Sequence, residues 1–196
     1  MSKKTLRLLP AGLAATSLLA TMVLPVVAPA SASPVENRLQ TVVTALDYTS
    51  TGWRFLQVSP STDVPQFAER HFDDSGWSTG QAGFGTTNGT CSWNNFTQVK
   101  TPWAVNTDIL LRHWVHIPRD AQEVRIQGTV DNDARVYLNG QLLQAVQSGN
   151  CTAGAIDVVV PASALDCNNV LAIRGHDYGV ASYLDVRVTY VKPTQA

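Results

Sequence analysis

Apolar and polar residues alternate in short runs along the chain, which is the pattern of β-strands with one buried face. In residues 124–130, Val124, Ile126 and Val130 share one face, and polar side chains occupy the other. Further runs rich in Val, Ile, Tyr or Trp, bounded by Gly, Pro, Asn or Asp, predict strands at residues 41–46, 53–57, 109–117, 134–138, 141–146, 156–160, 170–174 and 183–191. The chain is therefore rich in short strands.

Turn signals separate these runs, and helix signals are weak. Asn139-Gly140 is the strongest short signal for a β-hairpin, because both residues tolerate positive φ. No window of ten or more residues has a convincing 3.6-residue period, and only residues 64–71 suggest a helical turn or two. Many short strands with such turns predict an all-β fold, an antiparallel sandwich or barrel.

The alternating strand direction sorts the connections between two ends of the fold. The hairpin turn at Asn139-Gly140 marks one end, which we call the turn end, and the connections 118–123 and 161–169 fall there too. The opposite end, the loop end, is expected to collect the connections 86–108, 131–133, 147–154 and 175–181. Side chains of these four segments are therefore expected to form one surface.

The first 32 residues have the features of a signal peptide. Lys3, Lys4 and Arg7 precede an apolar stretch that prolines interrupt, and Ala30-Ser31-Ala32 supplies the small residues of a cleavage site. These interruptions favour a signal peptide over a membrane anchor, and nothing after residue 33 approaches the length of a membrane span. We expect a secreted, extracellular protein with one β-sandwich domain over residues 33–196.

Charge argues against two classes of partner. The signal holds three of the 14 Lys and Arg residues and none of the 15 Asp and Glu, so the mature chain has a net charge of −4. Nucleic acids and anionic membranes both require a basic face, and no block of like charge occurs in the chain. Neither is expected as a partner.

Three cysteines in an exported chain predict one disulfide and one remaining thiol. Cys151 and Cys167 flank a predicted strand, and five extended residues alone span roughly 17 Å, whereas a disulfide allows about 4.4–6.8 Å between Cα atoms. Cys91 and Cys151 both fall in loop-end connections, which predicts a Cys91–Cys151 bond. Cys167 then stays free or links a homodimer.

Several segments together resemble galactose-binding-like jelly-roll domains. These domains include the sugar-binding-like domain beside family 2 glycoside hydrolase barrels and many carbohydrate-binding modules. The matching segments are Phe72-Asp73-Asp74-Ser75-Gly76-Trp77, Ala82-Gly83-Phe84-Gly85, Leu110–Trp114, Val130–Asp133 with Val136–Gly140, Asn169–Ile173 and Tyr183–Val186. The resemblance implies an antiparallel jelly-roll β-sandwich, usually accessory to an enzyme and often binding ligands through loops at one end.

These motifs also have a structural interpretation. Trp77 is most simply a core residue, and Asp73 and Asp74 most simply cap a turn through bonds to backbone amides. No catalytic domain accompanies the matching segments in this sequence, in contrast to the usual setting of the family.

The loop end supplies the residue types that a carbohydrate site needs, which are flat aromatic faces and planar polar groups. The candidate ligand-binding residues are Trp93, Asn94, Asn95, Trp103, His176, Asp177 and Tyr178. Aromatic residues in loops mark interaction sites or pack the loop onto the fold, and the sequence leaves both alternatives open for the two tryptophans.

Metal and catalytic signals are weaker. Asp131, Asp133 and Asp177 are candidate calcium ligands, because hard cations take carboxylate oxygens, although ordinary turn bonding is the favoured interpretation. His113 and His116 are expected on opposite faces of a strand and form no zinc pair. No G-x-S-x-G motif or phosphate-binding glycine loop occurs, and only Asp131 with Asp177 offers a glycosidase carboxylate pair.

Three hypotheses follow. The leading one is a secreted, bacterial, non-catalytic carbohydrate-binding module that needs no cofactor. The second is a structural or protein-interaction module of the cell envelope, dimerising through Cys167. The third is a glycoside hydrolase with an unrecognised site.

Overall fold

Two β-sheets form the fold in the computed structural model, which describes residues 40–60, 62–86 and 99–192. The first sheet has the order β10 (Thr152–Val159), β7 (Gln122–Asp131), β12 (Tyr183–Lys192), β4 (Phe84–Gly85) and β5 (Thr101–Pro102), and β1 (Thr41–Leu46) also pairs with β12. The second has the order β3 (Ser78–Gln81), β2 (Thr51–Val58), β6 (Asp108–His116), β11 (Asn168–His176), β8 (Asp133–Leu138) and β9 (Gln141–Gln147).

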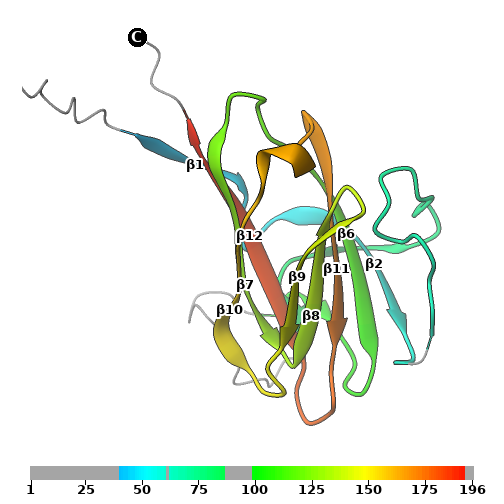
Figure 1. Ribbon diagram of the computed structural model, residues 1–196. Helices are drawn as coiled ribbons and strands as arrows, with labels where there is room; N and C mark the ends of the chain where they lie inside the picture. The colour runs from blue at the N-terminus through cyan, green and yellow to red at the C-terminus, as the bar shows by residue number, and fades with distance from the viewer. Residues whose placement is uncertain (1–39, 61, 87–98, 193–196) are drawn as a thin grey trace, which may run out of the picture. The chain divides into compact units, whose positions relative to one another are not determined.

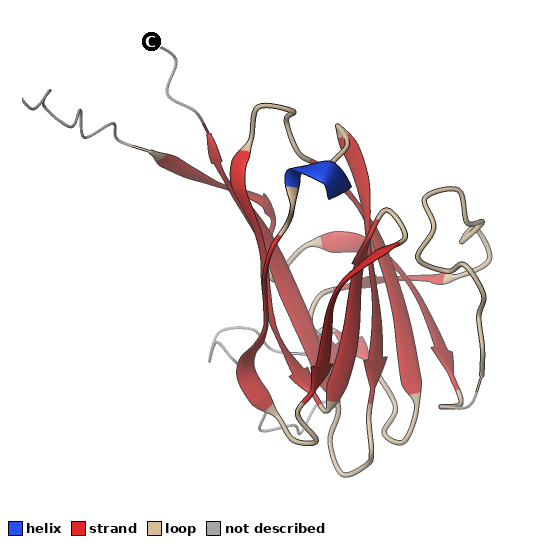
Figure 2. Cartoon of the chain, in the orientation of Figure 1, coloured by secondary structure: helices blue, strands red, loops and turns tan. Residues whose placement is uncertain are grey.

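The two sheets enclose one hydrophobic core, so the protein is the predicted all-β sandwich (Figures 1 and 2). Strand pairs are antiparallel except the short parallel pair β4–β5. Val124, Ile126 and Val130 of β7 are all buried in this core, as their alternation predicted. Val136 of β8 and Leu184 of β12 reach the same core from opposite sheets.

The register of the second sheet decides which side chains meet at the loop end. β11 pairs with β6 without a register shift from Asn168 opposite His116 to His176 opposite Asp108. On its other side β11 pairs with β8, and His176 lies opposite Asp133. Three residues with ionisable side chains, Asp108, His176 and Asp133, therefore lie in one row across the sheet.

A strap, residues 62–77, covers the middle of the outer face of the second sheet. Its Phe67 and Ala68 pack on Leu110 of β6 and Ala172 of β11 in a second, smaller hydrophobic cluster. The region predicted as a helical turn, residues 64–71, forms turns instead. Gln66 has a φ of 60°, a left-handed value that is incompatible with a right-handed helix.

Arg112 of β6 anchors the strap and is only 2% exposed. Its Nε donates to Asp74 Oδ2 at 2.7 Å, and its Nη1 donates to the carbonyls of Phe67 and of Glu69, the latter at 2.9 Å. Asp73 accepts from the Ser75 backbone N–H at 3.0 Å, as a turn cap does. Both aspartates were predicted to cap this turn. The carboxylate of Asp73 accepts from a backbone amide as predicted, whereas the carboxylate of Asp74 is paired with Arg112.

Some elements depart from the sequence prediction. The strands β3, β4 and β5 are two to four residues long and carry no alternation that could reveal them. A short 3-10 helix, Ala162–Ala164, lies in the turn-end connection before β11. No helix in the described ranges is long and apolar enough to cross a membrane.

The described cysteines behave as the predicted pairing requires. Cys167 is a free, half-buried thiol, and its Sγ accepts a hydrogen bond of 2.9 Å from Arg119 Nε of its own chain. Cys151 is not a free thiol. Cys91 lies outside the described residues, so the Cys91–Cys151 bond itself stays a prediction, and the described residues lend no support to a homodimer linked through Cys167.

Candidate functional site

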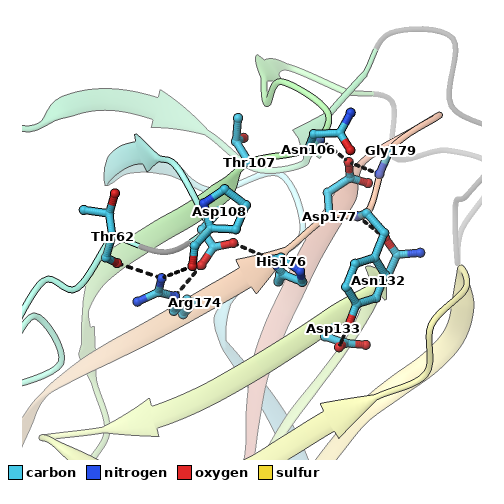
Figure 3. Close-up of polar contacts among 12 residues, drawn as sticks. Thr62, Asn106, Thr107, Asp108, Asn132, Asp133, Arg174, His176, Asp177 and Gly179 are labelled. Atoms are coloured by element: carbon cyan, nitrogen blue, oxygen red, sulfur yellow. Dashed lines mark hydrogen bonds and ion pairs between the residues drawn. The ribbon is translucent and has the colours of Figure 1, made fainter.

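A recess of about 460 Å³ opens at the loop end, on the outer face of the second sheet. Its walls come from the outward positions of β6, β8, β9 and β11, from residues 60–63 beside the strap, and from Tyr178 in the loop after β11. Figure 3 shows the polar side chains that form its floor. The predicted gathering of loop-end connections is present in the described part of the chain.

Asp108 is the central carboxylate of this floor and is buried. Its Oδ2 accepts from Arg174 Nε at 2.5 Å, and its Oδ1 is 2.5 Å from His176 Nδ1 (Figure 3). Because an ionised carboxylate can only accept, Nδ1 of His176 is the donor in this contact. Arg174 also donates to the carbonyl of Thr62 at 2.9 Å, which fixes the neighbouring chain segment to the floor.

Tyr178 supplies the exposed aromatic surface of the recess, with 57% of the residue accessible. Its hydroxyl donates to Asp133 Oδ2 at 2.5 Å, and this hydrogen bond raises the pKa of the phenol. Its ring meets the His176 ring edge to face, with centroids 4.5 Å apart. The two rings therefore form a rigid aromatic corner beside the polar floor.

Asp177 has a structural position, although the sequence marked it as a ligand-binding residue. It is 1% exposed, and its Oδ2 accepts from the backbone N–H groups of Asn106 at 2.7 Å and Gly179 at 2.8 Å. The side chain joins two loop-end connections (Figure 3). Asp177 has no exposed oxygen for a sugar hydroxyl.

Trp103 also lies inside the protein. It is 1% exposed, belongs to the main core, and donates from its indole N–H to Thr107 Oγ1 at 3.0 Å. The structure therefore shows the packing alternative for Trp103, because no face of the indole is open for stacking. Trp93, Asn94 and Asn95, the other predicted residues of this loop, lie outside the described residues.

The three aspartates considered for calcium do not act as one ligand set. Asp133 is bound by Tyr178, and Asp177 by backbone amides. Asp131 accepts from Asn132 Nδ2 at 2.9 Å, and its pKa is raised by burial and by the nearby negative charge of Asp177. Within residues 40–60, 62–86 and 99–192, no three His, Cys, Asp or Glu side chains gather as metal ligands.

Sequence reasoning missed Asp108, Arg174, Arg135 and Gln147, which all line the recess. The strand period of two could have indicated Arg174, because it precedes His176 by two residues and so shares its face. Asp108 could be placed only through the β6–β11 register, which the sequence does not reveal.

No protein-family model matches the sequence, and no curated protein matches it. Solved structures that resemble the chain include a β-glucuronidase of Bacteroides uniformis, with 17% identity and a TM-score of 0.48 over 77% of this chain and 18% of that one. A β-glucuronidase of Bifidobacterium dentium, complexed with coumarin-3-O-glucuronide, has 17% identity and a TM-score of 0.48 over 73% of this chain and 21% of that one.

A third similar structure is a β-glucuronidase from an uncultured Clostridium species, with 14% identity and a TM-score of 0.46. It is matched over 83% of this chain and 31% of its own length. The chain thus spans less than a third of each of these enzymes.

Proposed function

We propose that this protein is an exported, non-catalytic carbohydrate-binding domain that holds a saccharide in the loop-end recess. The observation that carries the proposal is the fixed aromatic corner of His176 and Tyr178 beside a floor of hydrogen-bonding groups. A sugar ring presents C–H groups on its faces and hydroxyl groups around its edge. An aromatic face next to planar donors and acceptors matches both kinds of surface.

The charges in the recess favour a neutral saccharide over a polyanion. Arg135 and Arg174 are balanced by Asp63, Asp108 and Asp133, so no excess of positive charge is available for phosphate or sulfate groups. The Arg174–Asp108 contact at 2.5 Å pairs the most buried of these charges within the protein. Polar groups fixed before binding lose little conformational entropy when a ligand arrives.

The carboxylates of the loop end are mostly held by hydrogen bonds within the protein, which favours binding without catalysis. Asp108 is buried and held from both sides by Arg174 and His176, and Asp133 is held by Tyr178. Asp177, one half of the glycosidase pair considered from the sequence, is buried among backbone amides. Asp63, the remaining carboxylate of the recess, is exposed, and one carboxylate alone does not form the pair that glycoside hydrolases canonically use.

The remaining support comes from the sequence. The resemblance to galactose-binding-like jelly-roll domains agrees with a sandwich that binds through one end, and the features of residues 1–32 agree with export. The partial likeness to carbohydrate-active enzymes adds no residue assignment.

The test is a glycan array of neutral polysaccharides and oligosaccharides, followed by titration of the strongest ligand. Tyr178→Ala removes the exposed ring and is expected to weaken binding at least tenfold, whereas Tyr178→Phe keeps the ring and is expected to weaken it less. Val159→Ala, at an exposed apolar position on the first sheet, is the matched control and should bind as the wild type does. Equal binding by Tyr178→Ala and the wild type would exclude the recess as the site.

A further inference from the structure

We propose a second saccharide-binding platform at Trp114, on the far side of the strap from the loop-end recess. The inference rests on the proposed function for the class of ligand, but its residues are different. Trp114 lies near the end of β6 and points to the outer face of the second sheet.

The exposure of Trp114 is unusual for its position in the sheet. The preceding outward residues of the same strand, Leu110 and Arg112, are covered by the strap and almost fully buried. Trp114 is 54% exposed, although β6 is flanked by β2 and β11. The β2–β6 pairing ends at Arg54 opposite Arg112, so no residue of β2 is paired beside the indole.

A polar recess of about 240 Å³ adjoins the indole, so Trp114 is more than a scattered surface aromatic. Its lining includes Arg54, Asp74 and Arg112. Arg54 Nη1 donates to Thr79 Oγ1 at 3.1 Å, and Arg112 is paired with Asp74 at 2.7 Å. The half-buried guanidinium of Arg54 is thus held in place before any ligand binds, whereas Arg112 is buried under the strap.

The orientation of the indole is also supported by the strap. The guanidinium of Arg70 lies 5.8 Å from the centroid of the Trp114 ring and forms an ion pair with Asp166 at 2.7 Å. A cation over an aromatic ring is attracted by the ring quadrupole, which helps to hold the indole in one orientation.

The pairing of charges around Trp114 selects the ligand. Arg54 donates to neutral groups of the strap end and β3, and both Arg70 and Arg112 have carboxylate partners. The carboxylates of Asp74 and Asp166 are both paired with arginines, which disfavours a basic peptide, whereas Arg54 keeps its charge and can donate to the hydroxyl groups of a ligand. A ring with C–H faces and neutral hydroxyl groups matches an aromatic face beside paired polar groups.

The two sites lie on one face of one sheet. Asp108 in the loop-end recess and Trp114 are six residues apart along β6, which corresponds to roughly 20 Å at about 3.3 Å per residue. A polysaccharide long enough to pass over the strap would engage both sites, and binding at two linked sites raises the overall affinity without new contacts.

The test uses the full mature chain and the neutral polysaccharide that the array identifies as its strongest ligand, together with a short oligosaccharide of the same sugar. Trp114→Ala is expected to reduce retention on the polysaccharide at least tenfold, and Trp114→Phe to keep at least a third of it. Val42→Ala, another exposed apolar residue on β1, is the matched control. Thermal melting of every variant verifies that the fold is intact.

The outcomes separate the two proposals. If Tyr178→Ala loses retention on the polysaccharide while Trp114→Ala is retained as the wild type is, the second platform alone is overturned. Loss in Trp114→Ala with wild-type retention in Tyr178→Ala would overturn the proposed loop-end site and support the platform. Equal loss in Trp114→Phe and Trp114→Ala would contradict stacking, and binding of proteins but of no glycan would overturn both.

Discussion

Single residues show how the surroundings of a side chain set its role, and Asp185 is the most informative. It lies on β12, is 3% exposed, and its Oδ1 has no hydrogen-bond partner. Burial raises the pKa of this carboxyl to about 8, because the low-dielectric surroundings disfavour the charged form. The folded protein therefore holds a proton there that the unfolded chain releases near its ordinary pKa of 3.8.

The sign of the resulting pH dependence follows directly. The contribution of Asp185 to stability is complete below the unfolded pKa and is lost as the pH rises toward about 8, with a slope of at most about 1.4 kcal/mol per pH unit. Asp185→Asn removes this titration, so we expect the variant to gain stability relative to the wild type between pH 5 and 8. Urea unfolding at both pH values measures the difference, and a constant difference would contradict the burial argument.

At the same scale, burial separates the predicted site residues that reach the solvent from those that do not. The pattern of aromatic and polar residues pointed to His176 and Tyr178 at the loop end, and both line the recess there. It could not tell that Trp103 and Asp177 point inward, because burial depends on how neighbouring loops pack. Short-range patterns thus indicated the end of the fold that carries the recess, but not its full set of side chains.

Strands and turns could be predicted where the local sequence pattern was sufficient. The alternation in β7 and the hairpin turn between β8 and β9 are local features, and both agree with the structure. The strap has no regular pattern, since it is held by the buried side chain of Arg112 through contacts with Asp74 and strap carbonyls. Such a segment depends on partners about forty residues away.

The strap provides a prediction about stability. Arg112→Met leaves Asp74 and two strap carbonyls without their donor, and loss of one partner of a buried ion pair typically costs about 3–5 kcal/mol. Arg125→Met removes a half-exposed ion pair with Asp157 at 2.6 Å and is expected to change the free energy of unfolding little. Chemical denaturation compares the two variants, and equal losses would show that Arg112 does not anchor the strap.

At the scale of the whole molecule, the predictions concern export, a covalent tie and a binding face. We predict that the secreted protein begins near Ser33 and contains a Cys91–Cys151 disulfide, with Cys167 as its free thiol. Peptide mapping by mass spectrometry without reduction should find the peptides of residues 91 and 151 joined. A disulfide-linked peptide pair that contains Cys167 would contradict both the Cys91–Cys151 pairing and the assignment of the connections to the turn end and the loop end.

At this scale the central claim is that the loop end of the second sheet holds a saccharide. The most direct measurement is an NMR titration of the isotope-labelled Trp114→Ala protein with its strongest neutral glycan, since this variant removes the proposed second platform. A saccharide bound in the recess is expected to shift the amide signals of residues 133–135 and 174–178, together with the side-chain signals of Arg174 and His176. Shifts confined to the turn end, around residues 161–169, would contradict the central claim.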